Sequence, residues 1–353
     1  MVKVISLPFG GAEAFDGLDI DVVYKRSLDN GETWSALAAL NSESSTDSGE
    51  DEYPSIGTNG DGRWITVWGG PNNDGGTGSD VFYSISDDNG TTWTAQAELE
   101  SGVEAFGDWA PVISNDGGDN WLVVWQSTND LGGTIGSDND FLYSYSSDNG
   151  QTWSSAAAVD SRAVSDGSVT DAWADVAMNS AGKVVLVWTS TNDLSGTIAS
   201  DTDILVSTSS DFGVSWTTSA ALNSNASSDT GADTYAKVAL DEDGNSVVVW
   251  DSNEDLNSTA GTDTDIFVSR SSDHGASWSA VAPLNSDATG AAASDRYPHI
   301  VGDGAGNWVA SWSTSTIFNS AISSDNGQTW TTKINVDEGI GSSTFRYMDL
   351  IVY

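Results

Sequence analysis

The sequence contains no cysteine, two histidines and only 11 lysine and arginine residues in a chain of 353. The absence of cysteine excludes disulfides, thiol catalysis and zinc–thiolate sites, and it fits either redox compartment. The few basic residues stand against 52 acidic ones, so the formal net charge is −41. Nucleic acid and anionic membrane surfaces are therefore unfavourable partners, and no apolar run is long enough to predict membrane insertion.

The acidic residues are mostly aspartate: the sequence has 41 Asp and 11 Glu. This excess matters because Asp serves turns and hard-cation sites, whereas a merely solvated acidic surface could equally use Glu. The apolar run in residues 1–10 is too short for a signal peptide and predicts a strand instead. We nevertheless expect a secreted or cell-surface protein in a saline or cation-containing medium.

One pattern, Ser-x-Asp-x-Gly-x-Thr/Ser-Trp, occurs six times and covers the chain. Its copies are Ser27–Trp34, Ser86–Trp93, Ser146–Trp153, Ser209–Trp216, Ser271–Trp278 and Ser323–Trp330. They recur with a mean spacing of about 59 residues, which indicates a repeat architecture. Each copy has the chemistry of a turn, because the Asp carboxylate accepts backbone N–H bonds, Gly takes positive φ and Trp packs the turn down.

The six copies closely resemble the Asp box, or bacterial neuraminidase repeat, of the sialidase superfamily. That resemblance implies a β-propeller in which the boxes lie at the periphery, away from the face that carries any site. It is specific for the fold and much less specific for activity, because fold does not fix function.

The segments between the boxes predict an all-β, six-bladed β-propeller with four antiparallel strands per blade, forming a single domain over residues 1–353. Short β-rich runs such as Trp64–Trp68 and Val81–Ser86 alternate with Gly, Asn and Asp clusters, which are hairpin signals. We expect both termini to share the last blade. Residues 346–351 would supply its first strand, and residues 2–6 and 19–24 its second and third.

Three similar loops offer an Asp-x-Asp pair preceded by a further Asp. Clustered carboxylates on Gly-rich loops suit Ca²⁺, which is the only cofactor that the sequence indicates. The alternative is that these side chains cap turns by binding backbone N–H groups. The candidate ligands are Asp130, Asp138, Asp140, Asp193, Asp201, Asp203, Asp255, Asp263 and Asp265.

An aromatic residue opens the innermost strand of every unit, and in five units an Asp precedes it closely. Rings beside carboxylates are typical of sugar-binding clefts, so we expect a glycan or cell-surface ligand here. The alternative is that the rings wedge between blades as core, since large aromatics are packing material first. The residues are Tyr53, Trp109, Trp173, Tyr235, Tyr297 and Tyr347.

Two residues beyond each aromatic, the residue type differs from one unit to the next. Four of these six positions hold Asp175, Lys237, His299 and Asp349. A shared scaffold requirement would give six similar residues, whereas one asymmetric ligand or reaction needs different ones. The competing interpretation is a structural Asp175–Lys237 ion pair with an ordinary hydrogen-bonded histidine.

The resemblance also allows a test for sialidase chemistry, which in that family uses three arginines to clasp a carboxylate. Of the six arginines, only Arg162, Arg296 and Arg346 could face a site, and Arg296 and Arg346 match parts of the family's arginine motif. The Asp residues that precede the aromatic positions would also repel an anionic sugar bound beside them. We therefore expect sialidase activity to be absent or marginal.

Three functions remain open from the sequence. The first is a carbohydrate-binding or surface interaction module. The second is a glycoside hydrolase, either sialidase-like or acting on neutral sugars with two carboxylates across the sugar. The third is a non-catalytic, cation-stabilised structural domain of a larger surface protein. The sequence favours a non-catalytic protein, and an enzyme with this sequence would be a glycoside hydrolase of sialidase-like fold.

Overall fold

In a computed structural model, the chain folds into antiparallel sheets that follow one another along the sequence. The structure describes residues 2–7, 20–29, 31–40, 49–71, 78–100, 106–136, 138–164, 169–256, 260–261, 263–285, 288, 293–315 and 317–336. These residues form two compact units, Met1–Val159 and Asp160–Tyr353, each holding three sheets. The prediction of one domain over the whole chain stays a prediction.

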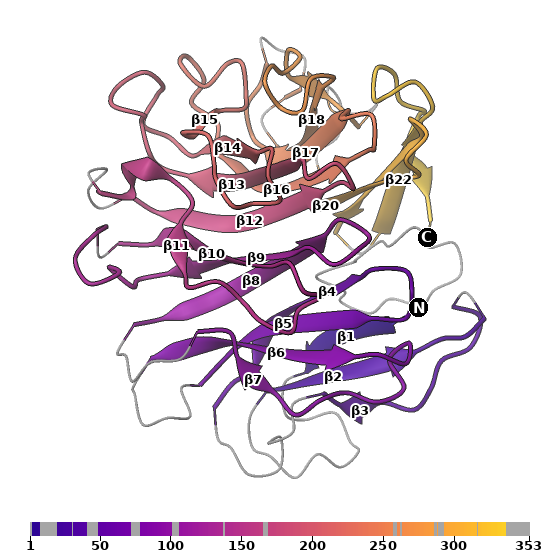
Figure 1. Ribbon diagram of the computed structural model, residues 1–353. Helices are drawn as coiled ribbons and strands as arrows, with labels where there is room; N and C mark the ends of the chain where they lie inside the picture. Colours follow the sequence, from indigo (N-terminus) through magenta and orange to yellow (C-terminus); the bar gives the residue numbers. More distant parts are fainter. Residues whose placement is uncertain are drawn as a thin grey trace. The chain divides into compact units, whose positions relative to one another are not determined.

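The first unit contains one three-stranded and two four-stranded sheets (Figure 1). Every strand pairs antiparallel with the next strand of its sheet, as hairpin-connected blades require. The strands are β1 (Val2–Leu7), β2 (Asp21–Arg26) and β3 (Ala38–Ala39); β4 (Glu52–Thr58), β5 (Trp64–Pro71), β6 (Ser79–Ser86) and β7 (Ala97–Glu98); and β8 (Asp108–Asn115), β9 (Trp121–Ser127), β10 (Asp140–Ser146) and β11 (Ala157–Ala158).

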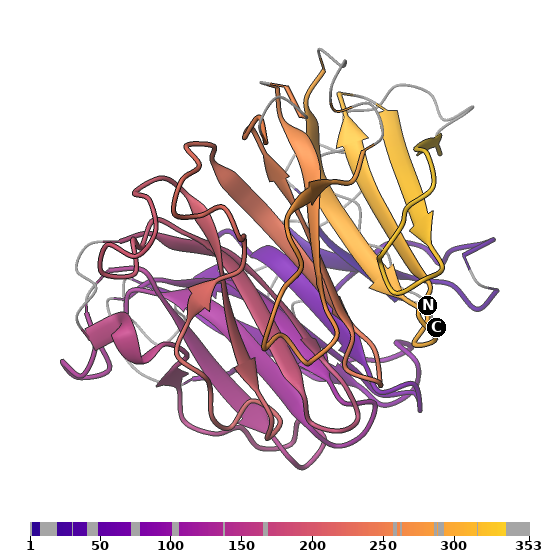
Figure 2. The same cartoon turned by 90° about the horizontal axis from the view of Figure 1, so that it is seen from above.

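The second unit contains three four-stranded sheets and one short 3₁₀ helix, η1 (Ser161–Val164). Figures 1 and 2 show its sheets stacked in chain order, with the innermost strands β12, β16 and β20 side by side. The strands are β12 (Asp171–Met178), β13 (Val184–Ser190), β14 (Asp203–Ser209) and β15 (Ala220–Ala221); β16 (Asp233–Leu240), β17 (Ser246–Ser252), β18 (Asp265–Ser271) and β19 (Ala282–Pro283); and β20 (Asp295–Gly302), β21 (Trp308–Thr314), β22 (Ile317–Ser323) and β23 (Ile334–Asn335).

Each of the six repeated sequence units forms one antiparallel sheet, and these sheets are the blades of a six-bladed β-propeller, as the sequence predicted. The first sheet has three strands, and β1, β2 and β3 occupy the places predicted for its second, third and fourth strands. The predicted first strand, residues 346–351, lies outside the described residues. Within the described part of the chain, no helix is long and apolar enough to cross a membrane.

The core lies between neighbouring sheets of each unit and is built around tryptophans of the second strands. Trp68, Trp125, Trp188, Trp250 and Trp312 occupy equivalent positions in β5, β9, β13, β17 and β21, and each is at most 1% exposed. Second strands such as β9 and β17 are buried along their whole length, which matches their continuous apolar runs.

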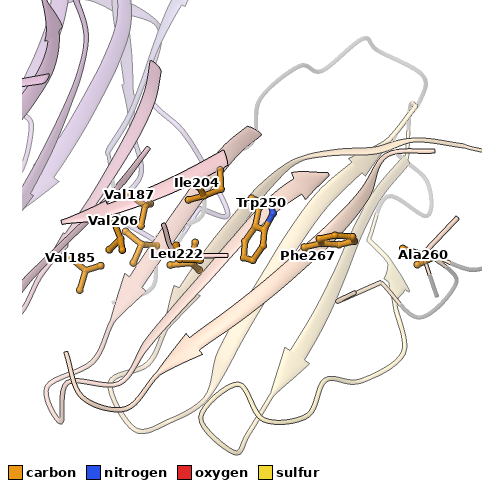
Figure 3. Packing of buried hydrophobic residues seen from close by; sticks show 12 residues of the cluster. Val185, Val187, Ile204, Val206, Leu222, Trp250, Ala260 and Phe267 are labelled. Carbon is orange, nitrogen blue, oxygen red and sulfur yellow. The ribbon is translucent and has the colours of Figure 1, made fainter. Parts of the chain in front are cut away.

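In the second unit, the indole of Trp250 packs edge-on against the ring of Phe267, with the ring centroids 6.2 Å apart (Figure 3). Ile204, Val206 and Leu222 of the preceding sheet complete this cluster. Side chains from two sheets therefore interdigitate, and burial of such large apolar surfaces is the main stabilising contribution to sheet stacking.

The six boxes are turns held by their own side chains, as predicted. In the box of residues 146–153, Ser146 Oγ donates to Asp148 Oδ1 at 2.8 Å, and Gly150 N donates back to Ser146 Oγ at 2.9 Å. Thr152 donates from its N–H and its hydroxyl to the two oxygens of Asp148. These bonds lower the pKa of Asp148 to about 2. The motif therefore needs no ligand to explain it.

Candidate functional site

The innermost strands share a local irregularity that begins with the predicted aromatic positions. In β4, β8, β12, β16 and β20 the pairing register shifts near the start of the strand, as in a β-bulge. Inside four of these bulges the aromatic residue itself has positive φ: Tyr53 (54°), Trp173 (56°), Tyr235 (54°) and Tyr297 (55°). In β8, Ala110 takes this conformation (50°) in place of Trp109.

Positive φ is uncommon for residues with a Cβ and is costly for bulky ones, so four aromatics in this conformation are an unusual arrangement. A bulge re-aims a side chain relative to its regular place in the pleat. The backbone therefore holds these rings in orientations that a regular strand would not give them.

Three of the rings meet in the second unit, and we call Trp173, Tyr235 and Tyr297 the aromatic row. The ring centroids of Trp173 and Tyr235 are 5.3 Å apart, and those of Tyr235 and Tyr297 are 5.0 Å apart. All three side chains are partly exposed. They are thus neither fully buried core nor isolated surface residues.

The other predicted aromatics lie at the equivalent positions of the first unit or beyond the described part of the chain. Tyr53 is 41% exposed at the start of β4, and Trp109 lies at the start of β8. Tyr347, Arg346 and Asp349 lie outside the described residues.

Two residues further along the same strands, Asp175, Lys237 and His299 form a second line that we call the polar row. Lys237 Nζ lies 3.1 Å from Asp175 Oδ1, and Asp175 Oδ2 accepts a hydrogen bond of 2.8 Å from the Val238 N–H. The carboxylate therefore joins β12 to β16, which agrees with the structural interpretation of this pair. Burial, and then the charge of Lys237, lower the pKa of His299 to about 3, so its imidazole is neutral at physiological pH.

Asp251 belongs to the same neighbourhood, and it is not among the site residues expected from the sequence. Its side chain, on β17 opposite Thr234, is 1% exposed. It accepts hydrogen bonds from the Thr234 hydroxyl and, at 3.4 Å, from the Tyr297 N–H. Burial raises the pKa of Asp251 to about 6, although these bonds and the charge of Arg296 oppose the shift.

A signal for Asp251 was present in the sequence. It directly follows the repeated tryptophan of the second strand, where the other described sheets carry smaller or uncharged residues. These are Gly69, Gln126, Thr189 and Ser313. Asp251 is thus a buried carboxyl group with a raised pKa that is hydrogen-bonded to the backbone of Tyr297.

The arginines show no convergence among the described residues. Arg162 donates to the Ser219 carbonyl and hydroxyl and lies 3.7 Å from Asp160, so it fixes the segment after β11 to the start of β15. Arg296 is exposed at the start of β20, with Thr264 Oγ1 at 3.4 Å. The expected absence of sialidase activity stays a prediction.

Some of the predicted metal ligands hold turns together, and others are buried at the start of a strand. Asp130 and Asp255 accept backbone N–H bonds within their own loops, from Gly132 (2.9 Å) and Gly261 (2.8 Å), as the turn interpretation requires. Asp193 contributes its backbone carbonyl to the turn that follows it.

The ligand candidates that begin a strand are buried instead. Asp140, Asp203 and Asp265 are the first residues of β10, β14 and β18. Within the described residues, one group of three carboxylates lies close enough to hold an ion, and it joins Asp203 to Asp229 and Asp233 rather than to Asp193 or Asp201. Asp138, Asp201 and Asp263 lie in the loops just before these strands. Calcium binding by the three predicted loops stays a prediction.

Two surface hollows of about 530 Å³ each are lined by residues other than those of the aromatic row. One is lined by Glu100, the loop 129–135 and β11 in the first unit. The other is lined by β18, β19 and the last box in the second unit. Neither contains Asp251 or the polar row.

The sheets and the repeated turns define a β-propeller of the Asp-box type. The chain belongs to the BNR repeat-like domain family, whose model matches residues 62–294. No curated protein matches the chain.

Solved structures share the fold at low sequence identity. A Penicillium chrysogenum α-L-arabinanase in complex with arabinobiose matches with 18% identity and a TM-score of 0.54 over 80% of each chain. The E242A mutant of a Fusarium graminearum α-L-arabinofuranosidase with an iminosugar inhibitor matches with 18% identity and a TM-score of 0.56, also over 80% of each chain. The Ruminococcus gnavus intramolecular trans-sialidase matches with 12% identity and a TM-score of 0.51 over 81% of this chain and 85% of its own.

Proposed function

We propose that this protein binds a neutral oligosaccharide along the aromatic row. The observation that carries the proposal is the contact of three partly exposed rings, each held at positive φ in a bulge of an innermost strand. Aromatic faces that remain accessible at a rigid position stack on the C–H faces of sugar rings with little loss of conformational entropy.

The charge of the protein favours a neutral sugar over an anionic one. The net charge is −41, and the buried Asp171 and Asp295 stand two residues before Trp173 and Tyr297 of the aromatic row. Carboxylates near the site would repel a sialic acid or uronic acid. The arabinobiose bound in the Penicillium structure gives a neutral sugar as the first ligand to test. A glycan ligand also favours a secreted or cell-surface location.

The test is calorimetric titration with neutral oligosaccharides, beginning with arabino-oligosaccharides, and with a sialylated oligosaccharide for comparison. Tyr235→Ala should weaken binding about 10-fold or more, because loss of one stacking ring costs about 1.4 kcal/mol or more. Tyr235→Phe should retain most of the affinity, because it keeps the ring.

Tyr145→Ala, in β10 of the first unit, is the control and should bind like the original protein. The proposal fails if no neutral oligosaccharide binds, or if the sialylated one binds more tightly. Absence of glycan binding would favour the alternative of a structural domain of a surface protein.

A second candidate function is hydrolysis of that neutral glycan, and Asp251 is the observation that favours it. A buried carboxyl group with a pKa of about 6, hydrogen-bonded to the backbone of Tyr297, has the environment of a general acid. Release of reducing sugar that disappears in Asp251→Asn, while oligosaccharide affinity remains, would support hydrolysis. Binding without release would leave a binding module.

A further inference from the structure

Three buried carboxylates meet where β14 and β16 begin. Asp203 and Asp233 are the first residues of these strands, and Asp229 lies in the connection before β16. One oxygen atom of each lies within 4.8 Å of the others, and the residues are 1%, 1% and 5% exposed in the order Asp203, Asp233 and Asp229. The Asp233 N–H donates to the Thr202 carbonyl at 2.8 Å, which fixes the two strand starts against each other.

Two asparagine side chains face the carboxylates, and their oxygens are unused. Asn223 Nδ2 donates to Asp203 Oδ1 (2.9 Å) and Asp229 Oδ2 (3.2 Å), and Asn225 Nδ2 donates to Asp229 Oδ2 (2.6 Å). Both amide oxygens are buried and accept no hydrogen bond, and the same holds for Asp203 Oδ2 and Asp229 Oδ1. Asn223 is 2% exposed, so solvent does not satisfy its oxygen.

The negative charge of the group is not compensated by protein. Within the part of the chain that the structure describes, no lysine or arginine forms an ion pair with Asp203, Asp229 or Asp233. Burial raises the pKa of Asp203 to about 7 and that of Asp229 to about 6. Burial also raises the pKa of Asp233 well above its ordinary value, and the Ser252 hydroxyl opposes this shift only in part.

Further acidic groups face the cluster from adjacent segments. The charge of Asp201, two residues before β14, raises the pKa of both Asp203 and Asp229, and the charge of Glu254, just after β17, raises that of Asp229. Isolated buried charges of this kind cost several kcal/mol each unless they are protonated, paired or bound to a metal.

At the equivalent junction of the next sheet, both ends of the asparagine amide are hydrogen-bonded. There Asn285 Nδ2 donates to both Asp265 (2.7 Å) and Asp295 (2.9 Å), and its own oxygen accepts the Ile266 N–H (3.2 Å). The Thr314 hydroxyl also donates to Asp295. The Asn223 junction differs in its amide oxygen, which accepts no hydrogen bond.

We propose that Asp203, Asp229, Asp233 and the side-chain oxygen of Asn223 bind a Ca²⁺ ion. Carboxylate and amide oxygens without nitrogen or sulfur donors suit Ca²⁺, which accepts six to eight oxygen ligands in flexible geometry. The amide of Asn223 supplies its oxygen by a 180° turn about its last bond, because the two ends of an amide occupy nearly the same space. The ion offsets carboxylate charge that no lysine or arginine of the described residues offsets.

The test compares the melting temperature of EDTA-treated protein with and without millimolar Ca²⁺ at constant ionic strength. At pH 8, Ca²⁺ should raise Tm by about 3 °C through binding to the native state. At pH 5 the rise should be below about 1 °C, because the ligands must lose protons to bind the metal. Mg²⁺ should act more weakly, since it gives up its water reluctantly.

Two variants separate this site from any other calcium site. Asp229→Asn should abolish the Ca²⁺ response without lowering the metal-free Tm, because it also removes repulsion. Asn223→Asp should do the opposite: a lower metal-free Tm and a larger Ca²⁺ response. The control is Asp243→Asn, which removes one exposed charge in the turn at the other end of β16 and should respond like the original protein.

Luminescence of Tb³⁺ sensitised by protein tryptophans provides a readout besides stability. It should rise with the original protein and be displaced by Ca²⁺, and most of the signal should be lost in Asp229→Asn. An unchanged Ca²⁺ response in Asp229→Asn, or no Ca²⁺ response of the original protein at pH 8, would overturn the proposal.

Discussion

At the scale of single residues, aspartate has two opposite roles in this protein. In the boxes the carboxylates are exposed and accept hydrogen bonds from their own turns, which lowers the pKa of Asp29, Asp88 and Asp148 to about 2. At Asp203 and Asp251, burial raises the pKa to about 7 and about 6. Burial thus favours the protonated form of the second group, whereas the box carboxylates stay ionised at neutral pH.

The raised pKa of Asp251 predicts a pH dependence for any hydrolytic activity. A general acid must be protonated, so kcat should fall about 10-fold for each pH unit above about 6. The measurement is the rate of reducing-sugar release from a neutral oligosaccharide between pH 4 and 9. In Asp251→Asn the rate should be lost at every pH, whereas Asp243→Asn should keep the original profile. A rate that rises above pH 7 would exclude Asp251 as the acid.

At the scale of elements, the box of residues 146–153 is a self-contained turn that also packs against the preceding sheet. Trp121 Nε1 donates to Asn149 Oδ1 at 3.0 Å, and Arg63 donates to the Asn149 carbonyl. The adjoining Gly150 has φ of 78°, and a Cβ there would lie 2.3 Å from Ile65 Cδ1 of β5. The turn conformation therefore favours glycine, and a Cβ there would in addition force the end of the Ile65 side chain to move.

A pair of glycine substitutions separates these two requirements. Gly60, in the β4–β5 turn, has φ of 80°, and a Cβ added there would have nothing within 4 Å, so Gly60→Ala should cost about 1 kcal/mol from backbone strain alone. Gly150→Ala adds steric overlap and should cost about 3 kcal/mol. Urea unfolding midpoints would measure both. Equal losses for the two variants would contradict the packing of this box on β5.

At the scale of the whole molecule, the dominant property is a net charge of −41. Such a charge destabilises a compact state through self-repulsion, and salt screens it over a Debye length of about 8–10 Å near physiological ionic strength. The buried carboxylates add to this cost wherever neither a proton nor a cation offsets their charge.

Stability should accordingly rise with salt at neutral pH. We expect Tm in EDTA at pH 7.5 to increase by at least about 3 °C between 0.05 and 0.5 M NaCl. At pH 4, where more of the carboxylates are protonated, the increase should be smaller. The same concentration range of a neutral osmolyte controls for effects unrelated to charge. A Tm that stays constant or falls with NaCl would show that self-repulsion does not limit stability.

The sequence by itself determined the repeat, the all-β propeller, the turn function of the boxes and the positions of the aromatic and polar rows. These features can be predicted because Asp, Gly and Trp form the same turn wherever they recur along the chain. Residues at equivalent positions of successive units also fall on adjacent strands. Asp175, Lys237 and His299 could be selected because they depart from that period.

Only the tertiary structure decided which carboxylates meet. Asp203 appeared in the sequence as part of an Asp-x-Asp loop, yet its partners are Asp229 and Asp233, which lie 26 and 30 residues further along the chain. Asp251 likewise became a candidate only through its burial opposite Thr234 and its hydrogen bond to Tyr297 of the next sheet. The physical reason is that charge state and ligand geometry depend on desolvation and on distances across sheets. These are set by strand register and by bulges rather than by neighbours along the chain.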